Sequence, residues 1–224
     1  MLVSCWSAKG GAGTTVVAAA LALTAALDDD AGSLLVDLAG DAPAVLGVPE
    51  PDGPGAADWL AAGPEVPVDA LARLEVEVGG DVSLIPWGRR PPGADAEDRA
   101  EVLAALLAGS PRSVVVDCGR IGHETDPVAS VRRTLAAAGT HSLLVTRGCY
   151  LALRHAVQAP LRPSAVVLVD EPGRSLGRLD VEAVVGAPVV ARVPWDAGVA
   201  RAVDAGLLVD RLPRGLARAL RHAA

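Results

Sequence analysis

Short apolar runs recur along the chain, and each is about long enough for one buried strand. Seven of them occur, at residues 2–6, 33–37, 82–88, 113–117, 141–146, 165–170 and 188–193. Most are rich in valine and leucine and do not alternate with polar residues, which is typical of strands buried on both faces of a parallel sheet. The pattern therefore predicts seven strands.

The segments between these runs have apolar residues at helical spacing or contain turn residues. Helical spacing occurs at residues 14–27, 58–62, 68–76, 95–108, 151–159, 179–185 and 212–222. Strands that alternate with helices form a mostly parallel sheet with helices on both faces. A chain of 224 residues can bury a full core, and we see no internal repeat. We therefore predict an α/β fold with a seven-stranded sheet, in a single domain of residues 1–224.

A glycine-rich segment, SAKGGAGTT at residues 7–15, lies between the first predicted strand and the first predicted helix. Glycines let the backbone curl so that several N–H groups point inward, and the helix N-terminus adds partial positive charge. The usual phosphate-binding loop reads G-x-x-x-x-G-K-[S/T]. Here Gly13 is the second glycine and Thr15 keeps the hydroxyl, but Thr14 replaces the lysine. Lys9 is the only lysine among 20 basic residues, which favours a role for it in this loop.

Residues 9–15 match K-G-G-x-G-K-[S/T] at every position except Thr14. That pattern is the deviant Walker A loop of the MinD/ParA family of P-loop ATPases, which this chain resembles over most of its length. The strand at 82–88 is similar to the family's L-x-x-L-P-x-G strand. The resemblance implies ATP and Mg²⁺ as ligands, and a homodimer in which Lys9 reaches the partner's ATP, there acting in catalysis if the protein is active. The nucleotide-binding residues of the loop are then Lys9, Gly10, Gly11, Ala12, Gly13, Thr14 and Thr15.

Two predicted strands end in aspartate, at Asp37 and Asp117. Ligands of open parallel sheets collect at the carboxyl ends of the strands. Thr15, Asp37 and Asp117 are therefore the candidate magnesium ligands, directly or through water. A Rossmann dinucleotide site is the alternative, because a glycine loop and an acid that ends the next strand also describe it. That site would need Gly or Ala where Val16 stands, and it gives Lys9 no role.

The chain departs from the family pattern at two catalytic positions. Thr14 stands at the position of the phosphate-binding lysine, and Ala39 replaces the acid that orients the attacking water. Asp41 is near in sequence but out of register, and it is a weak substitute. The segment after Asp117 also differs, with Cys-Gly-Arg in place of the family's D-x-P-x-G continuation. Positioned charge dominates phosphoryl transfer, so hydrolysis should suffer more than binding.

The base end of the nucleotide site is expected near two later segments. Relatives often carry an Asn that contacts adenine at the end of the sixth predicted strand, where this chain has Asp170. A carboxylate cannot donate to a base nitrogen unless it is protonated. The segment Pro194-Trp195-Asp196 resembles the family's I-P-x-D loop, which wraps the adenine in relatives. These four residues complete the predicted nucleotide site.

Charge and composition limit the kinds of partner and the cellular location that we expect for this protein. The net charge of −7 disfavours broad nucleic-acid binding. No apolar segment is long enough to span a membrane, and no basic segment precedes the first apolar residues, so we expect no secretory signal. Three cysteines in or beside apolar runs suit a reduced compartment, and we expect a cytoplasmic protein, recruited to a cell pole or membrane by partners. The basic helix at 212–222 could touch a membrane, but docking on the domain is favoured, because the helix has no aromatic anchor.

These observations lead to one functional hypothesis and one alternative. Eroded Walker A loops resemble those of the CpaE/TadZ group, whose actinobacterial relatives are often labelled septum-site-determining. The hypothesis is a degenerate ATPase that acts as a nucleotide-responsive, dimerising positioning or scaffold protein, with protein partners in a pilus or division apparatus. The alternative is an active ParA/MinD-type ATPase that partitions a chromosome or other cargo.

Overall fold

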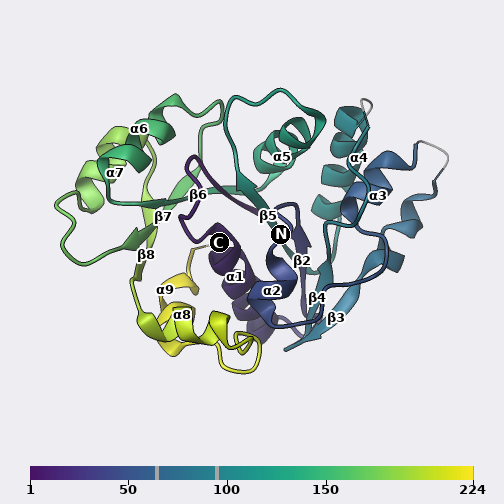
Figure 1. Ribbon diagram of the computed structural model, residues 1–224, viewed down its shortest axis with the longest axis horizontal. Coiled ribbons are helices and arrows are strands. Elements are labelled where there is room, and N and C mark those ends of the chain that lie inside the picture. The colour runs from purple at the N-terminus through teal and green to yellow at the C-terminus, as the bar shows by residue number, and fades with distance from the viewer. Residues whose placement is uncertain (64–65, 94–95, 224) are drawn as a thin grey trace.

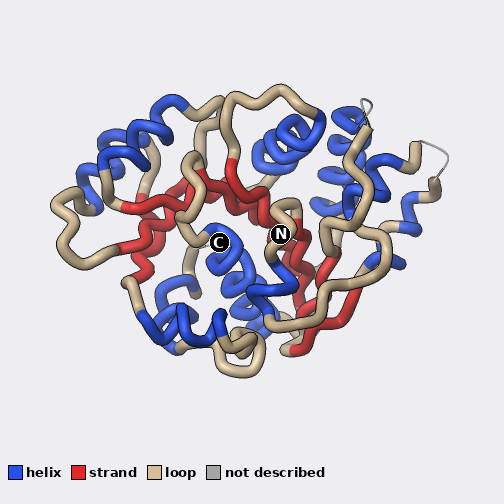
Figure 2. The backbone as a smooth tube through the Cα atoms, viewed as in Figure 1, coloured by secondary structure: helices blue, strands red, loops and turns tan. Residues whose placement is uncertain are grey.

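The computed structural model describes residues 1–63, 66–93 and 96–223. A single sheet runs through the described part of the chain, in the order β3-β4-β2-β5-β1-β6-β7-β8 (Figures 1 and 2). All neighbouring strands are parallel except β3 and β4. The strands are β1 (Leu2–Ser7), β2 (Ser33–Asp37), β3 (Val76–Gly79), β4 (Val82–Ile85), β5 (Ser113–Arg120), β6 (His141–Arg147), β7 (Ala165–Asp170) and β8 (Val189–Pro194). The predicted α/β class and the seven predicted strands are confirmed.

The eighth strand, β3, corrects the prediction of a seven-stranded sheet with helical structure at 68–76. That segment forms two short 3-10 turns, Val68–Ala70 and Ala72–Leu74, and then becomes strand at Val76. Gly79, Gly80 and Asp81 all have positive φ, at 94°, 62° and 56°, and this turn folds β3 back antiparallel to β4. The short alternation of valine and glutamate at 76–78 was the signal for a strand.

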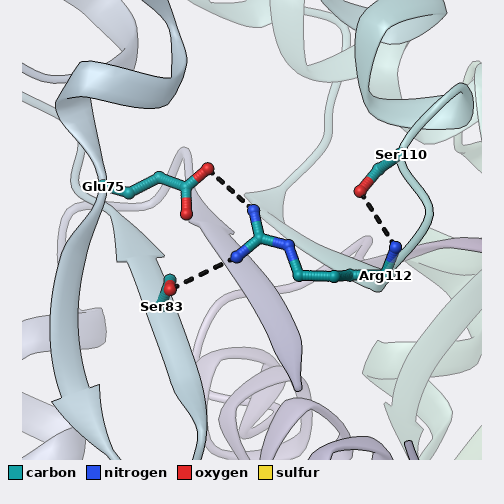
Figure 3. Close-up of polar contacts among 4 residues, drawn as sticks. All are labelled: Glu75, Ser83, Ser110 and Arg112. Atoms are coloured by element: carbon teal, nitrogen blue, oxygen red, sulfur yellow. Dashed lines mark hydrogen bonds and ion pairs between the residues drawn. The ribbon is translucent and has the colours of Figure 1, made fainter. Parts of the chain in front are cut away.

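Arg112, just before β5, ties this edge strand to the rest of the sheet (Figure 3). Its guanidinium donates to the carboxylate of Glu75 at 2.7 Å and to the hydroxyl of Ser83 at 3.4 Å. Its backbone N–H donates to the hydroxyl of Ser110 at 3.3 Å. The two charged side chains are only 24% and 21% exposed. Partial burial shields the ion pair from solvent. This ion pair should therefore contribute more to the stability of the folded state than an exposed ion pair does.

Helices cover both faces of the sheet, as expected (Figure 1). One face packs against α3 (Ala56–Ala61), α4 (Ala96–Ala108), α5 (Pro127–Ala138), α6 (Tyr150–Gln158) and α7 (Arg178–Val185). The other packs against α1 (Thr14–Asp28), α2 (Ala42–Leu46), α8 (Ala197–Asp204) and α9 (Arg214–Leu220). The helix expected at 95–108 is α4, and its expected first residue, Asp95, lies outside the described residues.

The last helix, α9, packs against β8 and α1. Its Leu216 and Leu220 are 3% and 1% exposed, so the apolar stripe faces the core. The docked interpretation of the basic tail therefore fits the packing. No helix in the ranges that the structure describes is long and apolar enough to cross a membrane.

The strand order decides which residues meet at the carboxyl edge of the sheet. β5 lies between β1 and β2, so the glycine loop after β1 is adjacent to the end of β5. In a Rossmann fold the first two strands are direct neighbours. The dinucleotide-binding alternative is therefore wrong.

Candidate functional site

The loop at residues 8–13 leaves the carboxyl end of β1 and turns into α1. Gly11 and Gly13 have φ of 75° and 90°. A Cβ added at either glycine would meet nothing within 4 Å, so the backbone conformation, and not lack of space, requires glycine here. Val17 donates to the carbonyl of Gly13 at 3.0 Å, so the first turn of α1 follows the loop directly. The positive end of a 15-residue helix thus lies behind the loop.

Three side chains, one in the loop and two at the start of α1, have different surroundings. Thr14 is 6% exposed, so its side chain lies in the interior. Thr15 is half-buried and lies beside the carboxylate of Asp117, whose pKa its hydroxyl lowers in part. Lys9 is exposed and makes no hydrogen bond or ion pair with any residue that the structure describes. This segment therefore offers one hydroxyl beside Asp117 and one exposed cation without a partner among the described residues.

Asp117 is fully buried within β5, which continues to Arg120, and it lies directly across from Asp37 in β2. Its Oδ1 accepts from the N–H of Gly119 at 2.9 Å, whereas its buried Oδ2 has no hydrogen-bond partner among the described residues. Burial raises the pKa of Asp117 to about 6, and the charge of Asp37 adds to this rise. A buried carboxylate oxygen without a partner, beside a threonine hydroxyl, fits a magnesium ion, which prefers oxygen ligands.

Asp37 is also fully buried, but its oxygens already have partners. Oδ1 accepts from Ala39 at 2.8 Å and from Gly40 at 2.7 Å, and Oδ2 accepts from Ala42 at 2.9 Å, all from backbone N–H groups. Burial raises the pKa of Asp37, while these three hydrogen bonds oppose the rise. Asp37 thus shapes the loop after β2, a role that the sequence analysis did not foresee.

No carboxylate is present at residue 39, where the family pattern has an acid. The Cβ of Ala39 packs against Gly119, where an added Cβ would lie only 3.1 Å from it. Asp41 is exposed at the start of α2, where its side chain makes no capping hydrogen bond, and its charge adds to the rise in the pKa of Asp37. Arg132 of α5, which sequence reasoning missed, donates to the carbonyl of Leu38 from two nitrogens, at 2.9 and 2.6 Å. Its charge also lowers the pKa of Asp117, and nothing local in the sequence indicated this contact.

A cavity of about 350 Å³ opens beside the glycine loop. Its wall brings together two segments that the sequence analysis assigned to one nucleotide, Gly11–Gly13 and Pro194–Asp196. Val16, Val169, Val199 and Val203 give it an apolar surface, and Arg147 from the end of β6 is a further charged wall residue. An apolar cavity lined in part by a glycine loop suits a flat ring attached to phosphates.

Asp170 does not line this cavity. Its carboxylate pairs with Arg192, and its backbone carbonyl accepts from the N–H of Trp195 at 2.9 Å. Asp170 therefore anchors the loop after β8: it lies opposite Pro194 in the sheet and holds the backbone of Trp195, while its own carboxylate is paired with Arg192. Within the described ranges, no group of three or more His, Cys, Asp or Glu residues forms a metal cluster of protein ligands alone.

The glycine loop after the central strand β1, with Asp117 in the adjacent strand β5, is the arrangement found in P-loop folds. No protein-family model matches the sequence. No curated protein matches it either.

Solved structures do match the fold. A ParA family ATPase from Chlorobium tepidum is 20% identical, with a TM-score of 0.75 over 98% of this chain and 96% of that one. The septum site-determining protein MinD of Pyrococcus horikoshii, solved with Mg-ADP, is 19% identical, with a TM-score of 0.72 over 99% and 93%. The MinC:MinD cell division complex of Aquifex aeolicus gives 16% identity and a TM-score of 0.73 over 98% and 94%. The chain therefore has the MinD/ParA type of P-loop ATPase fold.

Proposed function

We propose that this protein is a degenerate MinD/ParA-like ATPase that binds ATP with magnesium, dimerises, and serves as a positioning or scaffold protein with weak or absent hydrolysis. The observation that carries the proposal is that the site has the residue types suited to binding but lacks two that hydrolysis needs. The groups for holding a nucleotide and a metal are present, while two groups for turnover are replaced by Thr14 and Ala39.

The retained groups have clear tasks. The amides of the glycine loop and the start of α1 would hold the phosphates. Thr15 and Asp117 would hold the magnesium, with Asp37 acting through water, because its oxygens already accept three backbone N–H groups. The metal supplies charge neutralisation at the phosphates when it is bound. The solved MinD structure with Mg-ADP supports this choice of ligand.

The missing groups affect turnover more than binding. A hydrogen bond to a charged group contributes about 1.5–3 kcal/mol, so the lost lysine at position 14 weakens ATP binding by about tenfold or more without abolishing it. Hydrolysis also needs a carboxylate to orient water, and Ala39 cannot supply one. We therefore expect nucleotide to act on this protein as an assembly signal.

Lys9 is the group best placed for assembly. It is exposed, and it has no intramolecular partner in the described part of the chain. In a face-to-face dimer it would reach the partner's phosphates. The finer assignment is a CpaE/TadZ-like role in pilus assembly or in septum or pole localisation, and the MinC:MinD complex supports a protein partner for the dimer.

The experiment measures binding, assembly and turnover on the same purified protein. With ATP and Mg²⁺, we expect micromolar to millimolar binding by calorimetry, a monomer-to-dimer shift by light scattering, and little phosphate release. Lys9→Ala should abolish the dimer and leave ATP binding within about twofold. Arg162→Ala is the matched control, since it removes one exposed charge at the opposite edge of the sheet.

Fast magnesium-dependent phosphate release that Lys9→Ala abolishes would overturn the proposal in favour of an active ParA/MinD-type ATPase. The absence of any ATP binding would overturn it as well.

A further inference from the structure

Arg120 is the last residue of β5 and lies beside the glycine loop. It stands opposite Ser7 of β1, and the N–H of the next residue, Ile121, donates to the carbonyl of Ser7 at 2.8 Å. A Cβ added at Gly10 would lie 4.0 Å from the Cδ of Arg120, so the stem of the arginine passes alongside the loop. Arg120 therefore brings a positive charge to the segment that the phosphates of a nucleotide would contact.

A change of register in the sheet directs this side chain. β1 and β5 pair Cys5 with Asp117 but Ser7 with Arg120, so β5 contains one more residue than β1 between these two pairs. Gly119 lies in this interval and has a φ of 61°, a conformation that glycine adopts without strain. An extra residue of this kind changes the direction of the side chains around it. The segment after Asp117, which differs from the family pattern, thus places a guanidinium beside the loop.

Glu124 is the partner of this guanidinium among the residues that the structure describes. The two side chains form an ion pair and are 47% and 42% exposed. An ion pair as exposed as this one contributes little to stability, because water screens it. Glu124 itself is held in place, since its backbone carbonyl accepts from Arg133 of α5 at 2.5 Å. Arg120 can therefore leave Glu124 for a more strongly charged anion with little loss of stability.

The other cations near the loop are less available to a nucleotide bound by the same chain. Arg132 donates two nitrogens to one backbone carbonyl, and Arg147 pairs with Glu171, whose side chain is only 14% exposed. Lys9 is exposed, and the proposed dimer assigns it to the partner's nucleotide. Arg120 is the cation that can exchange a weak partner for a phosphate.

The strand order indicates which phosphate Arg120 would contact. The apolar cavity lies on the side of the loop toward β7 and β8, and its wall includes Gly11–Gly13 but neither Gly10 nor Arg120. Asp117 and Arg120 lie on the opposite side of the loop, in β5. A nucleotide whose ring occupies the cavity would therefore extend its phosphates toward β5, with its terminal phosphate nearest to Arg120.

We infer that Arg120 binds the terminal phosphate of ATP in place of the lysine missing at Thr14, and that Glu124 competes with this phosphate for the guanidinium. The inference rests on the proposed function, because it needs a bound nucleotide. A guanidinium can donate two parallel hydrogen bonds to a phosphate, which lets the phosphate displace a single exposed carboxylate. ADP lacks the third phosphate and does not make this contact, so Arg120 makes the site prefer ATP to ADP.

The test is calorimetry with ATP and with ADP, each with Mg²⁺. Arg120→Gln should weaken ATP binding about 10- to 100-fold, the effect of losing a hydrogen bond to a charged group, and leave ADP within about twofold. Arg120→Lys should retain more ATP affinity than Arg120→Gln, because the charge is kept. Arg73→Ala is the matched control and should change neither affinity. Arg73 also forms an exposed ion pair with a residue four positions away, but it precedes β3 at the far edge of the sheet.

Replacing Glu124 separates a phosphate contact from a purely structural ion pair. Glu124→Gln releases the guanidinium and should tighten ATP binding about two- to fivefold, since an exposed ion pair is weak. A structural ion pair predicts a loss instead, because removing either partner would then disturb the site in the same way. The double variant Arg120→Gln/Glu124→Gln should bind ATP no better than Arg120→Gln, because the gain depends on the arginine.

Three results would overturn this inference alone: unchanged ATP affinity in Arg120→Gln, equal losses for ATP and ADP in that variant, or weaker ATP binding in Glu124→Gln. In each case the wild type still binds ATP, so the nucleotide site stands and the role of Arg120 is wrong. If the wild type binds neither nucleotide, the proposed function fails, and this inference fails with it.

Discussion

Replacing Asp117 by asparagine tests two linked ideas. The buried carboxylate destabilises the folded protein when no metal is bound, and its charge serves to bind a metal. Asparagine has nearly the same shape and keeps an oxygen that can accept from Gly119. Oδ2 of Asp117 has no hydrogen-bond partner among the described residues, so the substitution removes a charge and breaks no hydrogen bond to that oxygen. We therefore expect Asp117→Asn to stabilise the protein when magnesium and nucleotide are absent.

The magnitude follows from the pKa. Burial raises the pKa of Asp117 from 3.8 to about 6. At about 1.36 kcal/mol per pKa unit, the ionised group costs the folded state about 3 kcal/mol above pH 6, and this figure is the upper limit for the gain. A raised carboxyl pKa means that the folded state binds more protons between pH 4 and 6, so wild-type stability falls as pH rises through that interval. The advantage of Asp117→Asn should be about half as large at pH 5 as at pH 7.5.

Urea unfolding followed by circular dichroism at pH 7.5 and pH 5 measures both effects. Asp37 also has a raised pKa, but it is present in both proteins and its contribution largely cancels. Asp41→Asn is the control, because it removes an exposed carboxylate at the same edge. ATP with Mg²⁺ should raise the unfolding midpoint of the wild type and have little effect on Asp117→Asn. If Asp117→Asn is no more stable than wild type at pH 7.5, or if its advantage is as large at pH 5, the reasoning is wrong.

Two other predictions concern the lost catalytic groups and the edge strand. Thr14→Lys should tighten ATP binding by about tenfold or more, measured by calorimetry against Thr14→Met, and adding Ala39→Asp should then raise phosphate release. Equal ATP affinity in both Thr14 variants would contradict the assigned position of the missing lysine. Arg112→Ala leaves Glu75 without its partner and should cost about 1–3 kcal/mol in urea unfolding. Arg73→Ala, which breaks an exposed ion pair, should cost about 0.5 kcal/mol or less, and similar losses in the two variants would refute the role of burial.

Local sequence predicted most of the fold, and its errors have identifiable causes. Six of the seven predicted strands are buried along most of their length, so their apolar signal is strong, and β8 alternates between buried and exposed residues. β3 has four residues and one buried side chain, so its alternation was too short to outweigh the helical spacing before it. The short helix α2 lacks the length that makes periodicity readable.

The residues of the candidate site likewise fall into two groups, those that the sequence could indicate and those that it could not. The glycine loop, Thr15 and Asp117 belong to short motifs whose glycines and apolar strands dictate local geometry, so the sequence could indicate them. Arg132 and Arg147 lie on α5 and β6, far along the chain from the loop, and arginine has no pattern that indicates its contacts. Asp170 shows the opposite case, because its position in the motif suggested a base contact, while Arg192 from the neighbouring strand holds its carboxylate.

By itself, the sequence determined the class of the fold, the glycine loop between the first strand and the first helix, and the presence of Thr14 and Ala39 where the family pattern has a lysine and an acid. These features depend on residue identity and on spacing along the chain. Only the tertiary structure decided that Lys9 is without an intramolecular partner in the described chain, that Asp37 is occupied by backbone amides, and that Trp195 stands against Arg147. The physical reason is that burial and pairing depend on which strands become neighbours. Here β5 between β1 and β2 places Asp117 beside the loop and leaves it without a full set of partners.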